Sequence, residues 1–182
     1  MSQIHGGNEL IKADIIAIAG VEAGMRVADL GCGNLGYFAF MTAKAVGKNG
    51  VVYAVDILKS VLEAVENKAR QEGFENVKVV WSNLEKVGAT KIPAGSLDVA
   101  YIHNMLFQST DDAAVLKEAY RLVKPGGKVL VIDWLKIATP FGPTIGERID
   151  AEEAKKCGVG AGFKLLQEFE AGPYHYGLVF QK

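Results

Sequence analysis

The sequence predicts an α/β protein with a doubly wound, mostly parallel sheet and an antiparallel hairpin at one edge. Short strand-like segments alternate with helix-like segments over most of the chain, and the strand-like segments are apolar at nearly every position. Such strands cannot face water on either side, so helices must cover both faces of the sheet. Near the end of the chain, two strand-like segments are joined by a link too short for a parallel pair.

Five strands are expected before that final pair. Each is a short apolar run bounded by glycine or turn residues. They are expected at residues 25–30, 50–56, 77–82, 96–104 and 127–133, the last after the turn KPGG. The final hairpin is expected from residues 163–171 and 174–181, joined by GPYH.

Five helices are expected between these strands and before the hairpin. Apolar residues recur at helical spacing, and glycines close the first three segments. Asn8 and Thr110 are the expected N-caps of two helices, and Asp150 with Glu153 forms a variant of the capping box. The helices are expected at residues 7–20, 37–47, 58–73, 110–123 and 150–158.

The composition is typical of one globular domain. The chain has 182 residues, of which 49% are hydrophobic, and a formal net charge of −1. No basic run points to nucleic acid. The two cysteines lack metal-ligand spacing, so no metal site is expected and a reducing, cytoplasmic location is the default. No apolar run reaches the ~18 residues of a membrane span, and the opening segment does not resemble a signal peptide.

The glycine-rich stretch after the first expected strand is the strongest functional signal. Residues 26–38 read RVADLGCGNLGYF, in which Gly31, Gly33 and Gly36 spell G-x-G-x-x-G. Glycines at this place let a ligand approach the backbone, and the start of the next helix offers N–H groups and a positive dipole end. A tight turn without a ligand is the alternative, because this motif alone is a weak signal.

Two acidic residues bear on the kind of ligand. Asp56 ends the second expected strand 20 residues after Gly36, which suits a carboxylate that binds ribose hydroxyls. Asp29 precedes the first glycine by two positions, where it would repel a diphosphate but suit the cationic aminoacyl group of S-adenosylmethionine. A carboxylate bonded to loop N–H groups is the structural alternative for Asp29. An NAD-dependent oxidoreductase stays open as the less favoured function.

Four segments, taken in order, resemble the motifs of class I S-adenosylmethionine-dependent methyltransferases: VADLGCGNLGYF, VYAVD, SLDVAYIHNMLF and RLVKPGGKVLVIDW. The likeness is to the small-molecule group related to ubiquinone/menaquinone-biosynthesis methyltransferases, and it covers roughly residues 8–182. It implies a Rossmann-like, seven-stranded sheet with the last strand inserted antiparallel. It also implies S-adenosylmethionine as cofactor and a small-molecule methyl acceptor. The loop GCGNLG is one residue longer than is usual in the family, which leaves the roles of Asn34 and Gly36 open.

The resemblance implies where the methionine and ribose parts of the cofactor would lie. Gly31, Cys32 and Gly33 would run along the methionine part, with Asp29 nearby. Asp56 would accept hydrogen bonds from the ribose hydroxyls.

The resemblance also implies an adenine site. Ile57 and Leu58 would lie against the adenine face, with ordinary packing at a helix start as the alternative. Asn83, followed by Leu84, stands where the family often has an aspartate that accepts from the adenine amine. An amide oxygen can make the same bond.

His103 is the favoured candidate for a general base. With Asn104 it ends the fourth expected strand, where the resemblance places it under the sulfonium. Methyl transfer mainly requires alignment and exclusion of water, and a base only if the acceptor is poorly nucleophilic. Tyr101, His175 and the more remote His5 are further candidates, and a purely structural role for His103 is an equal alternative.

The chain is expected to form one methyltransferase domain over residues 1–182. Residues 1–20 would form an initial helix and lid, residues 21–133 the cofactor-binding core, and residues 134–182 the acceptor side. The aromatic run at 173–176 could line an acceptor pocket, although packed hairpin aromatics are the simpler interpretation. Trp134 and the loop TPFGP, which follow the fifth expected strand on the acceptor side, could form a lid. The acceptor, a monomeric or dimeric state, and a non-catalytic cofactor-binding role are left open.

Overall fold

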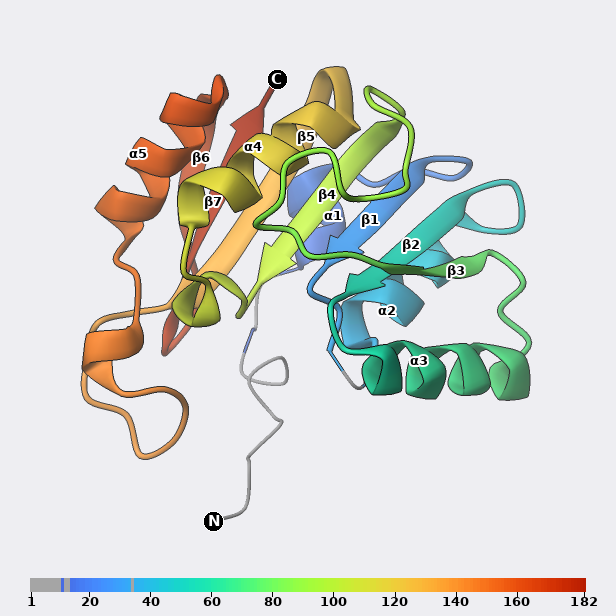
Figure 1. Ribbon diagram of the computed structural model, residues 1–182, viewed down its shortest axis with the longest axis horizontal. Helices are drawn as coiled ribbons and strands as arrows, with labels where there is room; N and C mark the ends of the chain where they lie inside the picture. Colours follow the sequence, from blue (N-terminus) through green and yellow to red (C-terminus); the bar gives the residue numbers. More distant parts are fainter. Residues whose placement is uncertain (1–10, 12–13, 34) are drawn as a thin grey trace.

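The computed structural model describes residues 11, 14–33 and 35–182, and these contain one seven-stranded sheet with the order β3-β2-β1-β4-β5-β7-β6 (Figure 1). Strands β1 to β5 pair in parallel, and β7 pairs antiparallel with both β5 and β6. The predicted α/β class, the parallel sheet and the inserted antiparallel strand are confirmed. The strands are β1 (Arg26–Leu30), β2 (Val51–Asp56), β3 (Val77–Trp81), β4 (Leu97–His103), β5 (Val123–Trp134), β6 (Lys164–Gly172) and β7 (His175–Gln181).

Helices cover both faces of this sheet. One apolar core lies between the sheet and α1, α2 and α3, and a second lies between the sheet and α4 and α5, the helices in front in Figure 1. The α-helices are α1 (Ile15–Ala19), α2 (Tyr37–Val46), α3 (Lys59–Glu72), α4 (Asp112–Leu122) and α5 (Ala151–Ala161), with 3-10 helices η2 (Leu106–Gln108) and η3 (Ile145–Glu147).

Neighbouring residues of the central strands enter opposite cores. In β1, Val27 belongs to the first core and Ala28 to the second, and in β2 Ala54 and Val55 divide in the same way. This burial on both sides explains why the strands are apolar at successive positions rather than at alternate ones.

The helix starts differ from the predictions at two places. The N-cap of α4 is Asp111, whose carboxylate accepts from the Ala114 N–H, and not Thr110, which donates through its N–H and hydroxyl to Glu85. The predicted cap at Asn8 lies outside the described residues, and α1 begins at Ile15 after an Asp14 cap.

Two element boundaries also differ. The KPGG segment was expected as a turn before the fifth strand, but β5 begins at Val123 and pairs with β4 through an irregular register at this segment. Helix α5 continues past the expected end at residue 158 to Ala161. Gly158 lies inside this helix, where it packs against the Phe180 ring and a Cβ would come within 2.5 Å of ring atoms.

None of the helices in the described residues is long and apolar enough to cross a membrane. In the same part of the chain, no three His, Cys, Asp or Glu side chains gather as a metal site would require.

Candidate functional site

The glycine-rich turn connects the carboxyl end of β1 to α2. Gly31, Gly33 and Gly36 all have positive φ angles, of 86°, 64° and 53°. This left-handed backbone is strained for any residue with a Cβ, which explains why three glycines stand here. Gly36 serves as the N-cap of α2.

The N–H groups of this turn are already engaged. Those of Gly31 and Cys32 both donate to the Val55 carbonyl of β2, at 2.8 and 3.0 Å. The Gly33 N–H donates to Asp56 Oδ2 at 3.1 Å, and the Gly36 N–H donates to the Gly33 carbonyl. The N–H groups expected as donors at the start of α2 lie beyond these four positions, so that expectation stays a prediction. A diphosphate at these four positions would meet engaged donors and the Asp56 carboxylate, which contacts the turn.

A buried acid–histidine pair lies beside the turn, where β1 and β4 end side by side. Asp29 Oδ1 lies 2.6 Å from His103 Nε2, and the ring of Phe38 from α2 packs edge-on against the imidazole at 4.3 Å. Asp29 Oδ2 and His103 Nδ1 have no hydrogen-bond partner among the described residues. Asp29 thus bonds to a histidine rather than to loop N–H groups, so the structural alternative predicted for it is wrong.

Cys32 lies inside the turn as an inert thiol. It is buried, and burial raises the pKa of its thiol strongly, with further upward shifts from the negative charges of Asp29 and Asp56. The thiolate is the nucleophilic form of cysteine, so Cys32 cannot act as a nucleophile near neutral pH.

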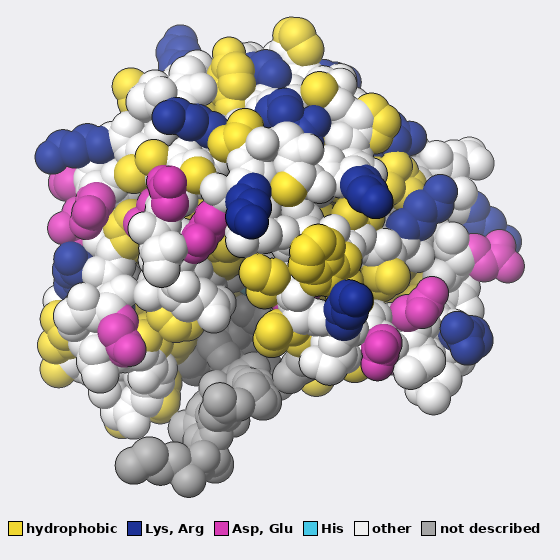
Figure 2. Space-filling view, in the orientation of Figure 1, with side chains coloured by type: hydrophobic (Ala, Val, Ile, Leu, Met, Phe, Trp, Pro, Cys, Tyr) yellow, Lys and Arg dark blue, Asp and Glu magenta, His cyan; other side chains and the backbone are white. Residues whose placement is uncertain are grey.

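The expected ribose and adenine residues lie next to the turn. Besides its bond to Gly33, Asp56 accepts from the Leu58 N–H at 3.0 Å. Ile57, Leu58 and Trp81 have exposed fractions of 51%, 57% and 53%, and the Trp81 indole donates to the Ile57 carbonyl. Figure 2 shows hydrophobic side chains gathered near the carboxyl ends of β2 and β3. This apolar surface suits the face of a flat ring.

Asn83 and Leu84, the two expected adenine residues that follow β3, differ in exposure. The Asn83 amide oxygen accepts from the Glu85 N–H at 2.9 Å, which leaves it a second lone pair for a ligand. Leu84 is buried in the second core. A contact of its side chain with adenine is therefore blocked by packing, and only its backbone is available for that expected role.

The other candidate bases lie in the core. Burial raises the pKa of the Tyr101 phenol, so it stays protonated near neutral pH. His175 is buried at the start of β7, with its ring centroid 4.3 Å from that of Trp134. Figure 2 shows no histidine side chain of the described residues on its face of the molecule. His5 lies outside the described residues.

Arg148 organises the loop after β5, and nothing in the sequence analysis pointed to it. Its guanidinium is buried over the Trp134 ring, 5.3 Å from the ring centroid. It donates to the carbonyls of Leu135, Ile137 and Pro143 and to the Thr139 hydroxyl. The segment expected to form an acceptor-side lid is thus fixed at its base by one side chain.

The titration of His175 gives a prediction for acid stability. Burial, and then the positive charge of Arg148, lowers the pKa of His175 from 6.5 to about 4. Between these values the unfolded chain binds a proton at His175 that the folded protein does not. The stability contributed by the buried neutral imidazole is therefore full above pH 6.5 and is lost as the pH falls towards 4. We expect His175→Leu to remove that loss, worth about 3 kcal/mol, in urea unfolding measured from pH 4 to 7.

Asp133 also titrates in this pH range, so its effect on stability must be separated from that of His175. Burial raises the pKa of its carboxyl to about 6, so its contribution runs in the opposite direction over a similar pH range. The wild-type protein and His175→Leu both carry Asp133. The difference between their slopes of unfolding free energy against pH therefore reports His175 alone. Equal slopes in the two proteins would contradict the assignment.

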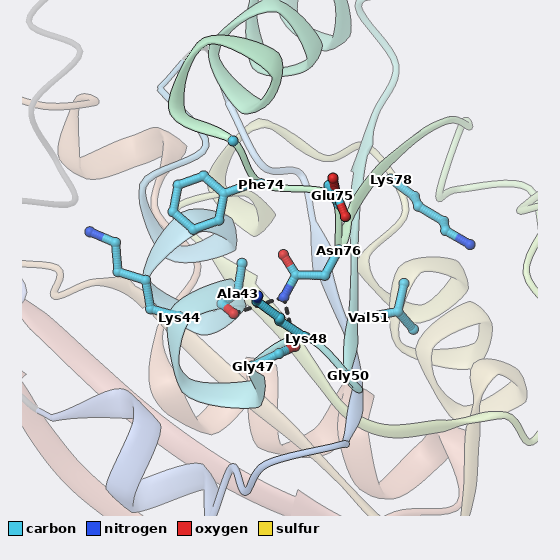
Figure 3. A pocket seen from close by; sticks show the side chains of 11 residues that line it. Ala43, Lys44, Gly47, Lys48, Gly50, Val51, Phe74, Glu75, Asn76 and Lys78 are labelled. Carbon is cyan, nitrogen blue, oxygen red and sulfur yellow. Dashed lines mark hydrogen bonds between the residues drawn. The ribbon is translucent and has the colours of Figure 1, made fainter.

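A cavity of about 600 Å³ lies near the amino ends of β2 and β3, away from the glycine turn (Figure 3). It is lined by the end of α2, the start of β2 and the segment before β3. The Asn76 amide points into its wall and donates to the carbonyls of Ala43 and Gly47. Its lysines are exposed, and the cavity contains none of the expected cofactor residues.

The glycine turn, Asp29, Asp56 and His103 lie together at the carboxyl ends of β1, β2 and β4. Comparisons with known proteins show which proteins share this fold. A crystal structure of a SAM-dependent methyltransferase from Aquifex aeolicus superposes with a TM-score of 0.87 at 26% identity, covering 97% of this chain and 92% of that one.

Curated relatives of similar sequence are also methyltransferases by name. A demethylmenaquinone methyltransferase of Geobacillus sp. is 33% identical over 122 residues, which are 67% of this chain and 50% of the relative. The ubiquinone/menaquinone biosynthesis C-methyltransferase of Laribacter hongkongensis is 33% identical over 138 residues, or 76% and 54% of the two chains. The chain therefore spans about half the length of these curated relatives. Residues 3–143 match the model of the ubiE/COQ5 methyltransferase family, and the chain belongs to that family.

Proposed function

We propose that this protein is an S-adenosylmethionine-dependent methyltransferase that acts on a flat, quinol-type small molecule. The observation that carries the proposal is the glycine turn, which lies between the carboxylates of Asp29 and Asp56 and whose Gly31, Cys32, Gly33 and Gly36 N–H groups are engaged. Such a turn disfavours a diphosphate and favours a nucleoside that carries positive charge. The family membership leaves the NAD-dependent alternative without support.

The residues of the site fit the cofactor. A Cβ at Gly33 would meet no atom within 4 Å, so the turn is open there to an approaching ligand. Asp56 is only partly buried and can accept from ribose hydroxyls with its remaining lone pairs. When bound, S-adenosylmethionine supplies a methyl group made electrophilic by its sulfonium. The negative charge of Asp29 would favour the bound cation, and Cys32 would stay an unreactive thiol.

A flat aromatic acceptor is supported by two observations. The curated relatives are named for demethylmenaquinone and ubiquinone/menaquinone methylation. On the acceptor side, Phe141 packs edge-on against Tyr174 at 5.2 Å and against Trp134 at 6.5 Å, which gives an aromatic wall behind the loop. Aromatic side chains favour stacked or edge-on contact with flat rings.

A general-base role for His103 stays a prediction. The bond from Asp29 holds the imidazole by Nε2, and Nδ1 is the nitrogen left for another group. A base would help a quinol acceptor by removing a hydroxyl proton. The division into a lid, a cofactor core and an acceptor side stays a prediction too, as do a cytoplasmic location and a monomeric or dimeric state.

Two measurements test the function. Calorimetric titration with S-adenosylhomocysteine and with NADH identifies the cofactor class, and binding of NADH alone would overturn the proposal. Incubation with methyl-labelled S-adenosylmethionine and a demethylated naphthoquinol then tests transfer. Cofactor binding without label in any quinol, or in any component of a metabolite extract, would instead indicate a binding module.

Asp56→Ala is expected to weaken S-adenosylhomocysteine binding by about 1.5–3 kcal/mol, the range of hydrogen bonds to a charged group. The loss has two sources, because the variant removes both the ribose acceptor and the bond to the Gly33 N–H. Calorimetry measures the change. Asp150→Ala is the control, because Asp150 caps α5 and lies outside the site. Unchanged affinity in Asp56→Ala would show the ribose assignment to be wrong.

A further inference from the structure

Asp133, at the end of β5, is a buried carboxylate that the proposed chemistry does not use. It is fully buried, and none of the described basic side chains forms an ion pair with it. Its Oδ1 accepts from the Trp134 N–H at 2.8 Å, and its Oδ2 accepts from the Leu106 N–H at 3.0 Å. An acid buried without a cation is costly, so packing alone does not account for this residue.

The Leu106 bond fixes the segment that follows His103. Asn104 adopts a φ of 48°, a left-handed conformation that few residues with a side chain adopt. Its N–H donates to the Ile132 carbonyl at 2.9 Å, and the chain then enters η2. Asp133 therefore holds the first N–H of η2 where the chain turns over the carboxyl edge of the sheet.

This segment reaches the cofactor turn through Met105. A Cβ placed on Gly31 would lie 2.8 Å from Met105 Cγ and 3.2 Å from Met105 Cβ. Met105 thus occupies the space next to the first glycine of the turn, and any shift of η2 moves the surface on which Gly31 rests. The contact links Asp133 on β5 to the turn after β1.

We propose that Asp133 is a positioning residue for cofactor binding, acting through η2 and Met105 on the backbone at Gly31. This inference rests on the proposed function, because the turn must bind the cofactor for its position to matter. The carboxylate suits the role because each of its two oxygens accepts from one N–H group, whereas an amide in the same place would turn its NH₂ towards one of these donors.

The test compares Asp133→Asn with Asp98→Asn in S-adenosylhomocysteine titrations. Asp98 also accepts a backbone N–H, from Arg26 at 2.7 Å, but it lies at the opposite ends of β1 and β4. We expect Asp133→Asn to weaken binding at least fivefold while Asp98→Asn keeps wild-type affinity. In turnover, the KM for S-adenosylmethionine should rise while the KM for the acceptor stays the same.

Met105→Ala keeps the inference testable if Asp133→Asn does not fold. It leaves both bonds of Asp133 intact but removes the contact with Gly31, and it should weaken binding by a similar factor. The variant with both substitutions should bind S-adenosylhomocysteine about as well as each single variant, because both substitutions disturb the same contact with Gly31. Wild-type affinity in Met105→Ala, or equal affinity in Asp133→Asn and Asp98→Asn, would overturn the inference. A wild-type protein that binds no S-adenosylhomocysteine would overturn the proposed function instead.

Discussion

Replacing Arg148 by methionine is expected to lower the free energy of unfolding by about 3–5 kcal/mol, because several acceptors lose their donor and each one left unpaired away from water costs about 1–3 kcal/mol. Methionine fills much of the same volume but donates no hydrogen bond. Three loop carbonyls and the Thr139 hydroxyl, all in partly buried bonds, would lose their donor. The cost of leaving buried acceptors unpaired exceeds the modest gain of making such bonds.

Urea unfolding of Arg148→Met, Arg148→Lys and Arg70→Met measures this effect. Lysine restores the charge but only as a compact donor, so we expect it to recover less than half of the loss. Arg70 is exposed on α3, and its replacement should change stability by no more than about 0.5 kcal/mol. A loss in Arg148→Met no larger than that of Arg70→Met would show that the loop does not depend on this side chain.

Arg148 also shows where sequence reasoning fails. Its partners are carbonyls of an irregular loop up to 13 residues away, and no residue type marks a carbonyl as an acceptor. The strands and helices were predictable because their apolar spacing repeats. The cap of α4 was misassigned by one residue because threonine and aspartate are both good caps, and only the position of Glu85 decides between them.

The residues of the candidate site could be predicted from the sequence, but most of the contacts between them could not. The glycines and Asp56 follow from a strand, a turn and a helix in sequence, and the structure brings them together. The bond between Asp29 and His103 spans 74 residues and depends on β1 and β4 being neighbours, which local patterns do not reveal. Met105 and Asp133 were missed for the same reason, since each matters only through a neighbouring strand.

Gly31→Ala is expected to weaken S-adenosylhomocysteine binding at least 100-fold, about 2.7 kcal/mol at this ratio. Two effects combine at this position. The φ of 86° is unfavourable for any residue with a Cβ, and the new methyl group would lie 2.8 Å from Met105 Cγ. Relief of this contact requires the turn or Met105 to shift, and we expect the turn to move, which displaces the backbone that the cofactor would approach.

Gly73→Ala and Gly33→Ala separate these effects. Gly73 has a φ of 74° and open space around it at the end of α3, so its variant carries the backbone strain without a change in affinity. Gly33 has a similar φ and equally open space, but it lies in the turn. If the cofactor occupies that space, Gly33→Ala must lose affinity while being no less stable than Gly73→Ala. Wild-type affinity in Gly33→Ala would mean that the ligand does not approach the turn at Gly33. The proposed placement of the cofactor against this turn would then be wrong.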